Sequence, residues 1–157
     1  MTEKRELVLE RVFDAPREEV FQAWTEPERM KHWFGPKTFT TPVCDIDLRK
    51  DGGFHLAMQS PEGKNYWVKG AYREIAEPER IVYADYFSDE EGHVVPPEDY
   101  GMSPEWPRET LVTVTFEEDE NQNTRMTMRS NVPDIKEAEM AEQGWNESFD
   151  KLAREVQ

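Results

Sequence analysis

The sequence predicts an α+β domain, an antiparallel sheet of about seven strands with a long C-terminal helix against it. Short alternating apolar runs separated by turn residues fill residues 41–132. Two short amphipathic segments follow the first apolar run, and one long amphipathic segment ends the chain. Because the apolar face of a sheet and the apolar stripe of a helix bury each other, the long helix is expected to cover the sheet.

A strand and two short helices are predicted before residue 37. Residues 6–13, ELVLERVF, have the pattern of a strand. Asp14 is a typical residue at the start of a helix. That helix carries one apolar face, made by Val20, Phe21 and Trp24. TEPE at 25–28 is a capping pattern for the second helix, which Gly35-Pro36 ends.

Six further strands follow, and one connection between them is long. The strands are expected near 42–49, 53–60, 65–76, 80–88, 110–118 and 124–131. Most are joined by short turns, so consecutive strands should pair antiparallel. Residues 89–108 are instead a long proline-containing loop, which in a compact domain is mobile or functional. We predict that Tyr100, Met102 and Trp106 make it a gate over a cavity or a partner contact. The alternative is that the loop packs them on its own domain.

The last segment is predicted to be the longest helix. Its apolar stripe consists of Ala138, Ala141, Trp145, Phe149, Leu152 and Val156. Asp134 and Glu137 can cap its start. Gly144 interrupts the stripe at a cost of about 1 kcal/mol relative to Ala, and close packing of the backbone is one explanation. With neither repeats nor linkers in the sequence, we expect one domain over residues 1–157.

Charge and hydropathy exclude several partners. Lys and Arg number 19 and Asp and Glu 34, which gives a net charge of −15. Such a surface repels phosphates, so nucleic acid and anionic membranes are not expected partners. No apolar run approaches the roughly 20 residues of a membrane span, and the charged N-terminal segment does not resemble a secretion signal. We expect a cytoplasmic protein without membrane insertion, either a monomer or a homodimer.

No residue pattern predicts a catalytic residue, a cofactor or a metal site. Cys44 is the one cysteine, and its neighbour Asp45 disfavours a reactive thiolate. The three histidines, His32, His55 and His93, lack metal-ligand spacing. An enzyme would need a polar group aimed into an apolar space, and three residues are candidates for it: His55, Asp85 and Arg129.

Aromatic and methionine side chains are the more informative group. Met adapts to irregular space and to varied ligands. Nine such residues are candidates for the lining of a cavity: Trp67, Tyr72, Tyr83, Phe87, Met126, Met128, Met140, Trp145 and Phe149. The alternative is that they form an ordinary core.

Several blocks carry a family resemblance. VFDAPREEVFQAWTEPERMKHWFGP, VKGAYREIAEPERIVYADYF and GWNESFDKLAREV resemble, in this order, blocks of the START-like, helix-grip (SRPBCC) superfamily. Within it the chain is similar to the C-terminal domain of the activator of heat-shock protein 90 ATPase, from about residue 7 to 156. The resemblance implies a START/Bet v-like curved sheet that grips the C-terminal helix around a hydrophobic cavity. The two short helices would plug one end, with Trp24, Trp33 and Phe34 as anchors. We expect His32 to be a rim or surface residue.

Three functions are compatible with these observations. The first is a carrier or sensor of a small apolar or aromatic molecule, with a link to the stress response. The second, which the resemblance implies, is an interaction protein or co-chaperone-like factor related to that activator. The third is a cyclase- or hydrolase-type enzyme that uses the same cavity.

Overall fold

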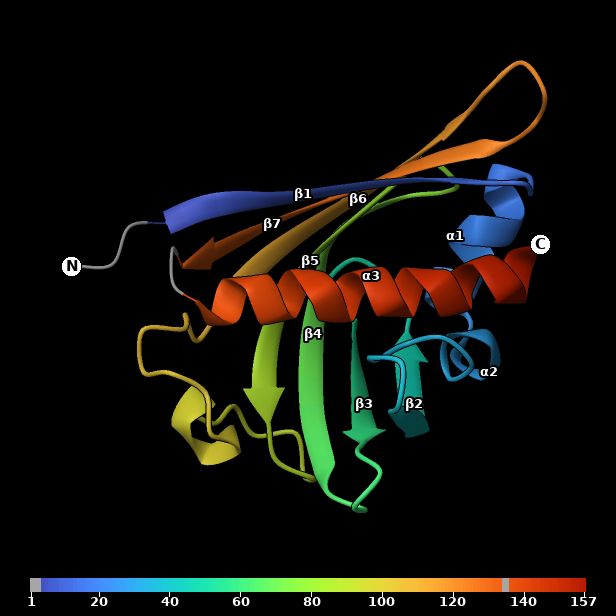
Figure 1. The fold of residues 1–157 in the computed structure, drawn as a ribbon. Coiled ribbons are helices and arrows are strands. Elements are labelled where there is room, and N and C mark those ends of the chain that lie inside the picture. Colours follow the sequence, from blue (N-terminus) through green and yellow to red (C-terminus); the bar gives the residue numbers. More distant parts are fainter. Residues whose placement is uncertain (1–3, 134–135) are drawn as a thin grey trace.

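One curved antiparallel sheet with a long helix across its concave face confirms the predicted helix-grip fold (Figure 1). The computed structural model describes residues 4–133 and 136–157. The strands are β1 (Lys4–Phe13), β2 (Thr40–Asp47), β3 (Gly53–Gln59), β4 (Asn65–Ala76), β5 (Arg80–Ser88), β6 (Thr110–Glu118) and β7 (Thr124–Pro133). The helices are α1 (Arg17–Thr25), α2 (Pro27–Met30), α3 (Glu137–Val156) and the 3₁₀ turn η1 (Pro97–Tyr100).

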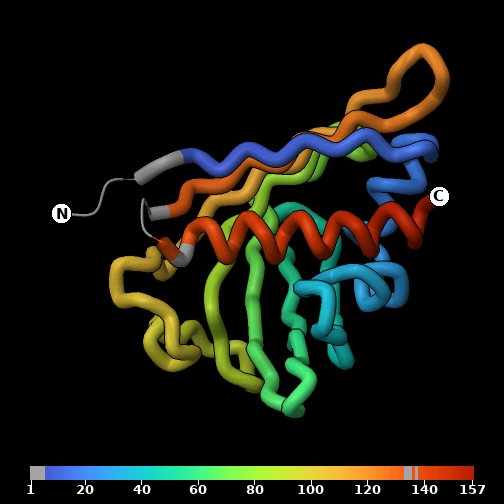
Figure 2. The backbone as a smooth tube through the Cα atoms, in the orientation of Figure 1, coloured from blue at the N-terminus to red at the C-terminus, as the bar shows by residue number. Residues whose placement is uncertain are grey.

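Strands β2 to β7 lie side by side in chain order, and β1 is added next to β7. Its order is β1-β7-β6-β5-β4-β3-β2, so β1 and β2 are the two edges. Every neighbouring pair is antiparallel, as the short turns predicted. In Figure 2 the orange turn between β6 and β7 and the yellow loop between β5 and β6 project at opposite corners of the molecule. The yellow loop is the long connection that the sequence predicted.

The inner face of the sheet follows from the period of two along each strand. In β6, Val112, Val114 and Phe116 are buried, and the residues between them are not. Helix α3 covers this face with its apolar stripe, in which Phe149 and Leu152 are completely buried. Met140 lies outside the stripe and is 70% exposed.

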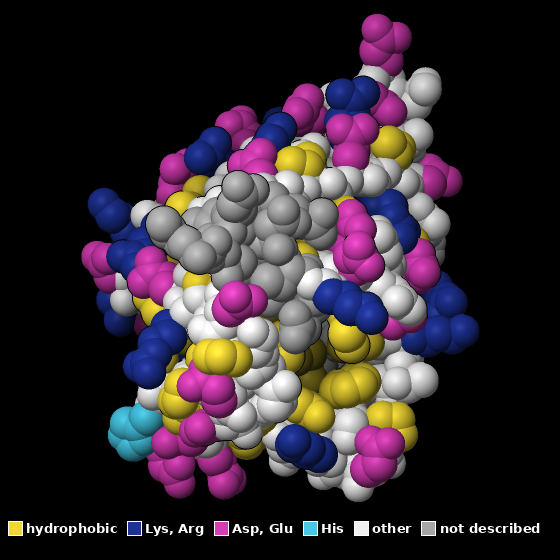
Figure 3. All heavy atoms as spheres, turned by 60° about the vertical axis from the view of Figure 1, so that its left-hand side comes forward, with side chains coloured by type: hydrophobic (Ala, Val, Ile, Leu, Met, Phe, Trp, Pro, Cys, Tyr) yellow, Lys and Arg dark blue, Asp and Glu magenta, His cyan; other side chains and the backbone are white. Residues whose placement is uncertain are grey.

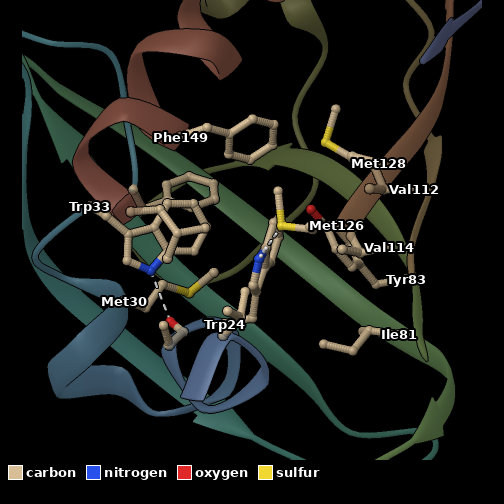
Figure 4. Packing of buried hydrophobic residues seen from close by; sticks show 14 of the residues in the cluster. Trp24, Met30, Trp33, Ile81, Tyr83, Val112, Val114, Met126, Met128 and Phe149 are labelled. Carbon is tan, nitrogen blue, oxygen red and sulfur yellow. Dashed lines mark hydrogen bonds between the residues drawn. The ribbon is translucent and has the colours of Figure 1, made fainter. Parts of the chain in front are cut away.

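Helices α1 and α2 plug one end of the sheet, and aromatic residues of α1 and of the turn after α2 are the anchors that the family resemblance implied. Trp24, Trp33 and Phe34 are all buried. Figure 4 shows how they are held: Trp24 Nε1 donates a hydrogen bond to Met126 Sδ at 3.2 Å, and Trp33 Nε1 donates to a backbone oxygen of α1 at 2.8 Å. Both indole N–H groups therefore have hydrogen-bond partners inside the protein, as buried polar groups require.

His32 lies on the surface, one of the two placements predicted for it, and links the turn after α2 to α3. Its side chain is 66% exposed, and Nδ1 lies 2.8 Å from Oε1 of Glu155 on α3. Arg29 on α2 binds the same carboxylate through Nε at 3.2 Å. His32 and Arg29 therefore share the Glu155 carboxylate in a surface network that ties α2 and the turn after it to α3.

Two expectations for α3 have different outcomes. The predicted close packing of the backbone at Gly144 was wrong, because a Cβ placed there would lie 3.6 Å from Cγ of Pro36, an ordinary contact. The predicted cap at Asp134 lies outside the described residues. No helix within 4–133 and 136–157 is long and apolar enough to cross a membrane.

Candidate ligand-binding site

A hollow opens on the side of the molecule where α3 begins (Figure 3). In Figure 1 the loop joining β5 to β6 leaves the end of β5, swings outward through η1 and returns beside the first turns of α3. Figure 3 looks at the molecule from this side and shows hydrophobic side chains around a depression beneath the charged surface. This hollow is the site that the helix-grip fold would offer to a ligand.

Strand register identifies the side chains that face it. Val68 of β4 pairs with Leu56 of β3 and with Phe87 of β5, and all three share the inner face. Tyr66, two residues before Val68, lies on the same face. Phe87 and Tyr66 are only half-buried, although β4 and β5 are interior strands. Inward rings that remain accessible indicate space next to them.

The predicted lining residues divide into three groups. Tyr72, Tyr83, Met126, Met128 and Phe149 are buried in the core, while Phe87 and Trp145 are half-buried on the same inner side. Trp145 packs on Trp24, with ring centroids 6.1 Å apart, and on Phe34 at 5.7 Å. The structure therefore brings these seven residues together between sheet and helix.

Trp67 and Met140 do not join them. Trp67 alternates with Val68 and so lies on the outer face, where its ring stacks on His55 with centroids 4.9 Å apart. Met140 points away from the sheet into solvent. Neither side chain faces the hollow.

The long loop packs its apolar side chains back onto the domain. Tyr100 packs between Tyr66 and Phe87, with ring centroids 5.5 and 5.8 Å away and the rings tilted. Its hydroxyl donates to the backbone oxygen of Ser88 and accepts the backbone N–H of Trp67 at 3.2 Å. Met102 and Trp106 are half-buried, and Trp106 contacts the core cluster. Tyr100 thus pins the loop across the ends of β4 and β5, at the edge of the hollow.

Asp85 lies on the inner face of the sheet and is one of the three polar residues that an enzyme could use. It stands two residues from Phe87 on β5, opposite Gly70 of β4. Its Oδ1 is buried and has no hydrogen-bond partner within the described part of the chain. Burial raises the pKa of the Asp85 carboxyl to about 7, partly offset by a hydrogen bond from the backbone of Tyr86.

The other polar candidates face elsewhere. His55 lies on the outer face with Nε2 3.0 Å from the backbone oxygen of Asp89. Arg129 pairs with Glu6 at 3.0 Å on the exposed side of β7 and β1. Burial raises the pKa of the Cys44 thiol to about 12, which keeps it protonated and unreactive. Among the three residues named as candidates for an enzyme, Asp85 is the one that strand register places on the inner face of the sheet.

Two other features of the surface resemble binding sites. A wide groove of about 780 Å³ follows edge strand β2, but charged side chains such as Glu28, Lys31 and Asp47 line it, which does not suit an apolar molecule. Asp89, Glu91 and His93 lie within 4.8 Å of one another. The hydrogen bonds from His93 to Asp89, at 2.8 Å from the backbone and 3.1 Å from the ring, explain this arrangement as a turn.

Comparisons with known proteins place the chain in a family. Solved structures with the same fold include a protein of Chromobacterium violaceum, 26% identical, with a TM-score of 0.78 and 96% of each chain covered. A protein of Staphylococcus epidermidis is 27% identical, with a TM-score of 0.78, 99% of this chain covered and 92% of that one. An AHSA1 protein of Silicibacter pomeroyi, 23% identical with a TM-score of 0.72 and 97% of each chain covered, shows the fold.

No curated protein matches the chain. The model of one family does match, over residues 14–157. The chain belongs to the family described as activator of Hsp90 ATPase homolog 1-like protein.

Proposed function

We propose that the protein is a cytoplasmic carrier or sensor that binds a small aromatic or apolar molecule between the sheet and α3. The observation that supports it best is the hollow beside α3, with the half-buried rings of Tyr66, Phe87 and Tyr100 at its edge and the carboxyl of Asp85 on the same face. An apolar space with few polar groups is what small-molecule sites have in common.

Burial of the accessible rings provides the driving force. Each Å² of apolar surface taken out of water stabilises a complex by roughly 25 cal/mol. Phe87 and Tyr66 retain accessible surface in the free protein. A ligand that covers them gains this free energy without the cost of opening the core, because the space already exists.

A fluorescent probe tests the proposal. N-phenyl-1-naphthylamine is small, uncharged and apolar, and its emission rises when it leaves water. We expect saturable enhancement with the wild-type protein. Phe87→Ala should weaken the affinity by about tenfold, since a lost aromatic contact costs about 1.4 kcal/mol or more.

Trp67→Ala is the matched control. It also removes a large half-buried ring, from the neighbouring strand, but on the outer face against His55. We expect it to leave the affinity for the probe unchanged. Absent enhancement, or equal losses in the two variants, would contradict the proposal.

A second proposal is a protein-interaction role of the kind that the family description names. The net charge of −15 favours it, because a strongly acidic surface steers a basic partner electrostatically. The test is the ATPase rate of heat-shock protein 90 with and without the protein. Stimulation that falls steeply with added salt would support this role, and an unchanged rate would remove it.

A further inference from the structure

We propose that Asp85 binds the polar end of the ligand, so that the site takes molecules with an aromatic body and one hydrogen-bond-donating group, a hydroxyl or a protonated amine. This inference rests on the proposed binding function. It adds the chemical class of the ligand and names the residue that selects it.

Strand geometry directs the Asp85 side chain into an apolar environment. Its cross-strand neighbour on β4 is Gly70, which has no side chain. The ring of Phe54 occupies the space there, since a Cβ on Gly70 would lie 2.0 Å from Phe54 Cε2. On β5 itself, Tyr83 and Phe87 flank Asp85 on the same face. The carboxyl therefore stands among rings rather than among cations.

The unpartnered oxygen is the second observation. Within residues 4–133 and 136–157, Oδ1 of Asp85 is shielded from solvent and accepts no hydrogen bond. Leaving a buried acceptor unpaired costs about 1–3 kcal/mol, and more when it is charged. Folded proteins keep few such atoms, and a binding site is one place where they are retained. A donor supplied by a ligand would recover this cost.

The surrounding titratable groups do not neutralise Asp85. Tyr83 lies on the same face of the same strand, and Tyr72 of β4 is its cross-strand partner. Burial raises the pKa of both phenols, so both stay uncharged near neutral pH. The β6 neighbour is Thr110, which does not titrate. An ionised Asp85 thus attracts an ammonium group, and the protonated form still offers its carbonyl oxygen to a hydroxyl. A ligand carboxylate is disfavoured.

Four compounds that share a naphthalene ring separate the effects of an ammonium group, a hydroxyl group and a carboxylate on binding. They are 2-naphthylmethylamine, 2-naphthol, naphthalene and 2-naphthoate. The affinity of each compound is measured by its displacement of N-phenyl-1-naphthylamine, once the affinity of every variant for this probe is known. In the wild type we expect the amine and the naphthol to bind about tenfold more tightly than naphthalene, and naphthoate to bind most weakly.

Two variants assign the selectivity to Asp85. Asp85→Asn keeps the size and removes the charge, so the advantage of the amine should fall about tenfold while that of the naphthol partly remains. Asp85→Leu removes the acceptor, so both advantages should disappear. Naphthalene affinity should change less than about threefold in either variant, because the apolar walls stay intact.

Each outcome decides between the two proposals. If the wild type binds all four compounds alike, or if both variants keep the wild-type order, the role of Asp85 is refuted and the binding function stands. If neither the probe nor any of the four compounds binds, the binding function itself fails.

Discussion

Two groups of aromatic side chains lie against the same sheet and helix, and they differ in how completely they are enclosed. The closed cluster, formed by Trp24, Trp33, Phe34 and Phe149, is at most 6% exposed. The open cluster, formed by Tyr66, Phe87 and Tyr100, is half-buried throughout. Aromatic residues alone thus do not distinguish a core from a binding site, whereas their enclosure does.

The cause of the difference is what covers each cluster. The closed cluster has α1, α2 and α3 around it, and its indole N–H groups of Trp24 and Trp33 bond within the protein. The loop between β5 and β6 covers the open cluster, held there by the hydroxyl of Tyr100, and Phe39 packs on Tyr66 with ring centroids 5.7 Å apart. Disrupting the closed cluster should therefore mainly lower the stability of the protein. Disrupting the loop over the open cluster should mainly change ligand binding.

The largest expected effect is at the closed cluster. Trp33→Ala should lower the free energy of unfolding by about 3–5 kcal/mol, because the side chain is completely buried and leaves a cavity. Urea unfolding followed by circular dichroism measures it. Trp106→Ala, which removes a half-buried ring from the loop, should cost less than half as much. Equal costs would mean that the two regions are not distinct.

A smaller effect is expected for the pH dependence at Asp85. A carboxyl with a pKa of about 7 when folded and near 3.9 when unfolded keeps its proton longer in the folded protein. Between pH 4 and 7 the unfolded chain therefore binds fewer protons, and stability falls as the pH rises. The full cost reaches about 4 kcal/mol above pH 7.

Asp85→Asn removes this titration. We expect the variant to gain about 2 kcal/mol over the wild type between pH 5 and pH 8, less than the full cost because part of that cost is already present at pH 5. Unfolding in urea at both pH values measures the difference, in which the other carboxylates cancel. A stability difference that does not change with pH would show that Asp85 titrates normally.

Sequence patterns predicted the strands better than they predicted the site. β4, β5 and β6 begin and end at the predicted residues, and β2 starts two residues earlier, at Thr40, where an irregular register precedes Val43. The turns and alternation that set these bounds are local. The enclosure of a side chain depends on distant elements, so the closed and open clusters could not be separated from sequence.

The placement of Trp67 could have been predicted. It shares its strand face with Lys69 and Arg73, whereas Val68 and Tyr72 share the other, and this parity assigns Trp67 to the outside. The same parity places Tyr66, which the prediction missed, on the inside. Met140 likewise lies outside the stripe that Ala138 and Ala141 define.

The cover of the open cluster gives a third prediction. Tyr100→Phe keeps the ring but removes the hydroxyl that bonds to Ser88 and Trp67, at a cost of about 1 kcal/mol. If the loop is a gate, N-phenyl-1-naphthylamine should also dissociate several-fold faster in stopped-flow measurements. Tyr86→Phe is the control, because its hydroxyl bonds to the exposed Glu109. Unchanged dissociation in both variants would mean that the loop only packs.

The smallest effect is expected at Gly144, on the helix that both clusters share. Gly in a helix interior is less favourable than Ala by about 1 kcal/mol, and the unfolded chain also loses freedom when Ala replaces it. The added methyl would meet Cγ of Pro36 at 3.6 Å without a clash. Gly144→Ala should therefore raise the free energy of unfolding by about 0.5–1 kcal/mol at both pH 5 and pH 8. The same variant should leave probe affinity unchanged, because the contact is with Pro36 and not with the open cluster. A loss of stability would show that α3 needs a close approach at this turn, and a loss of affinity would extend the binding site to it.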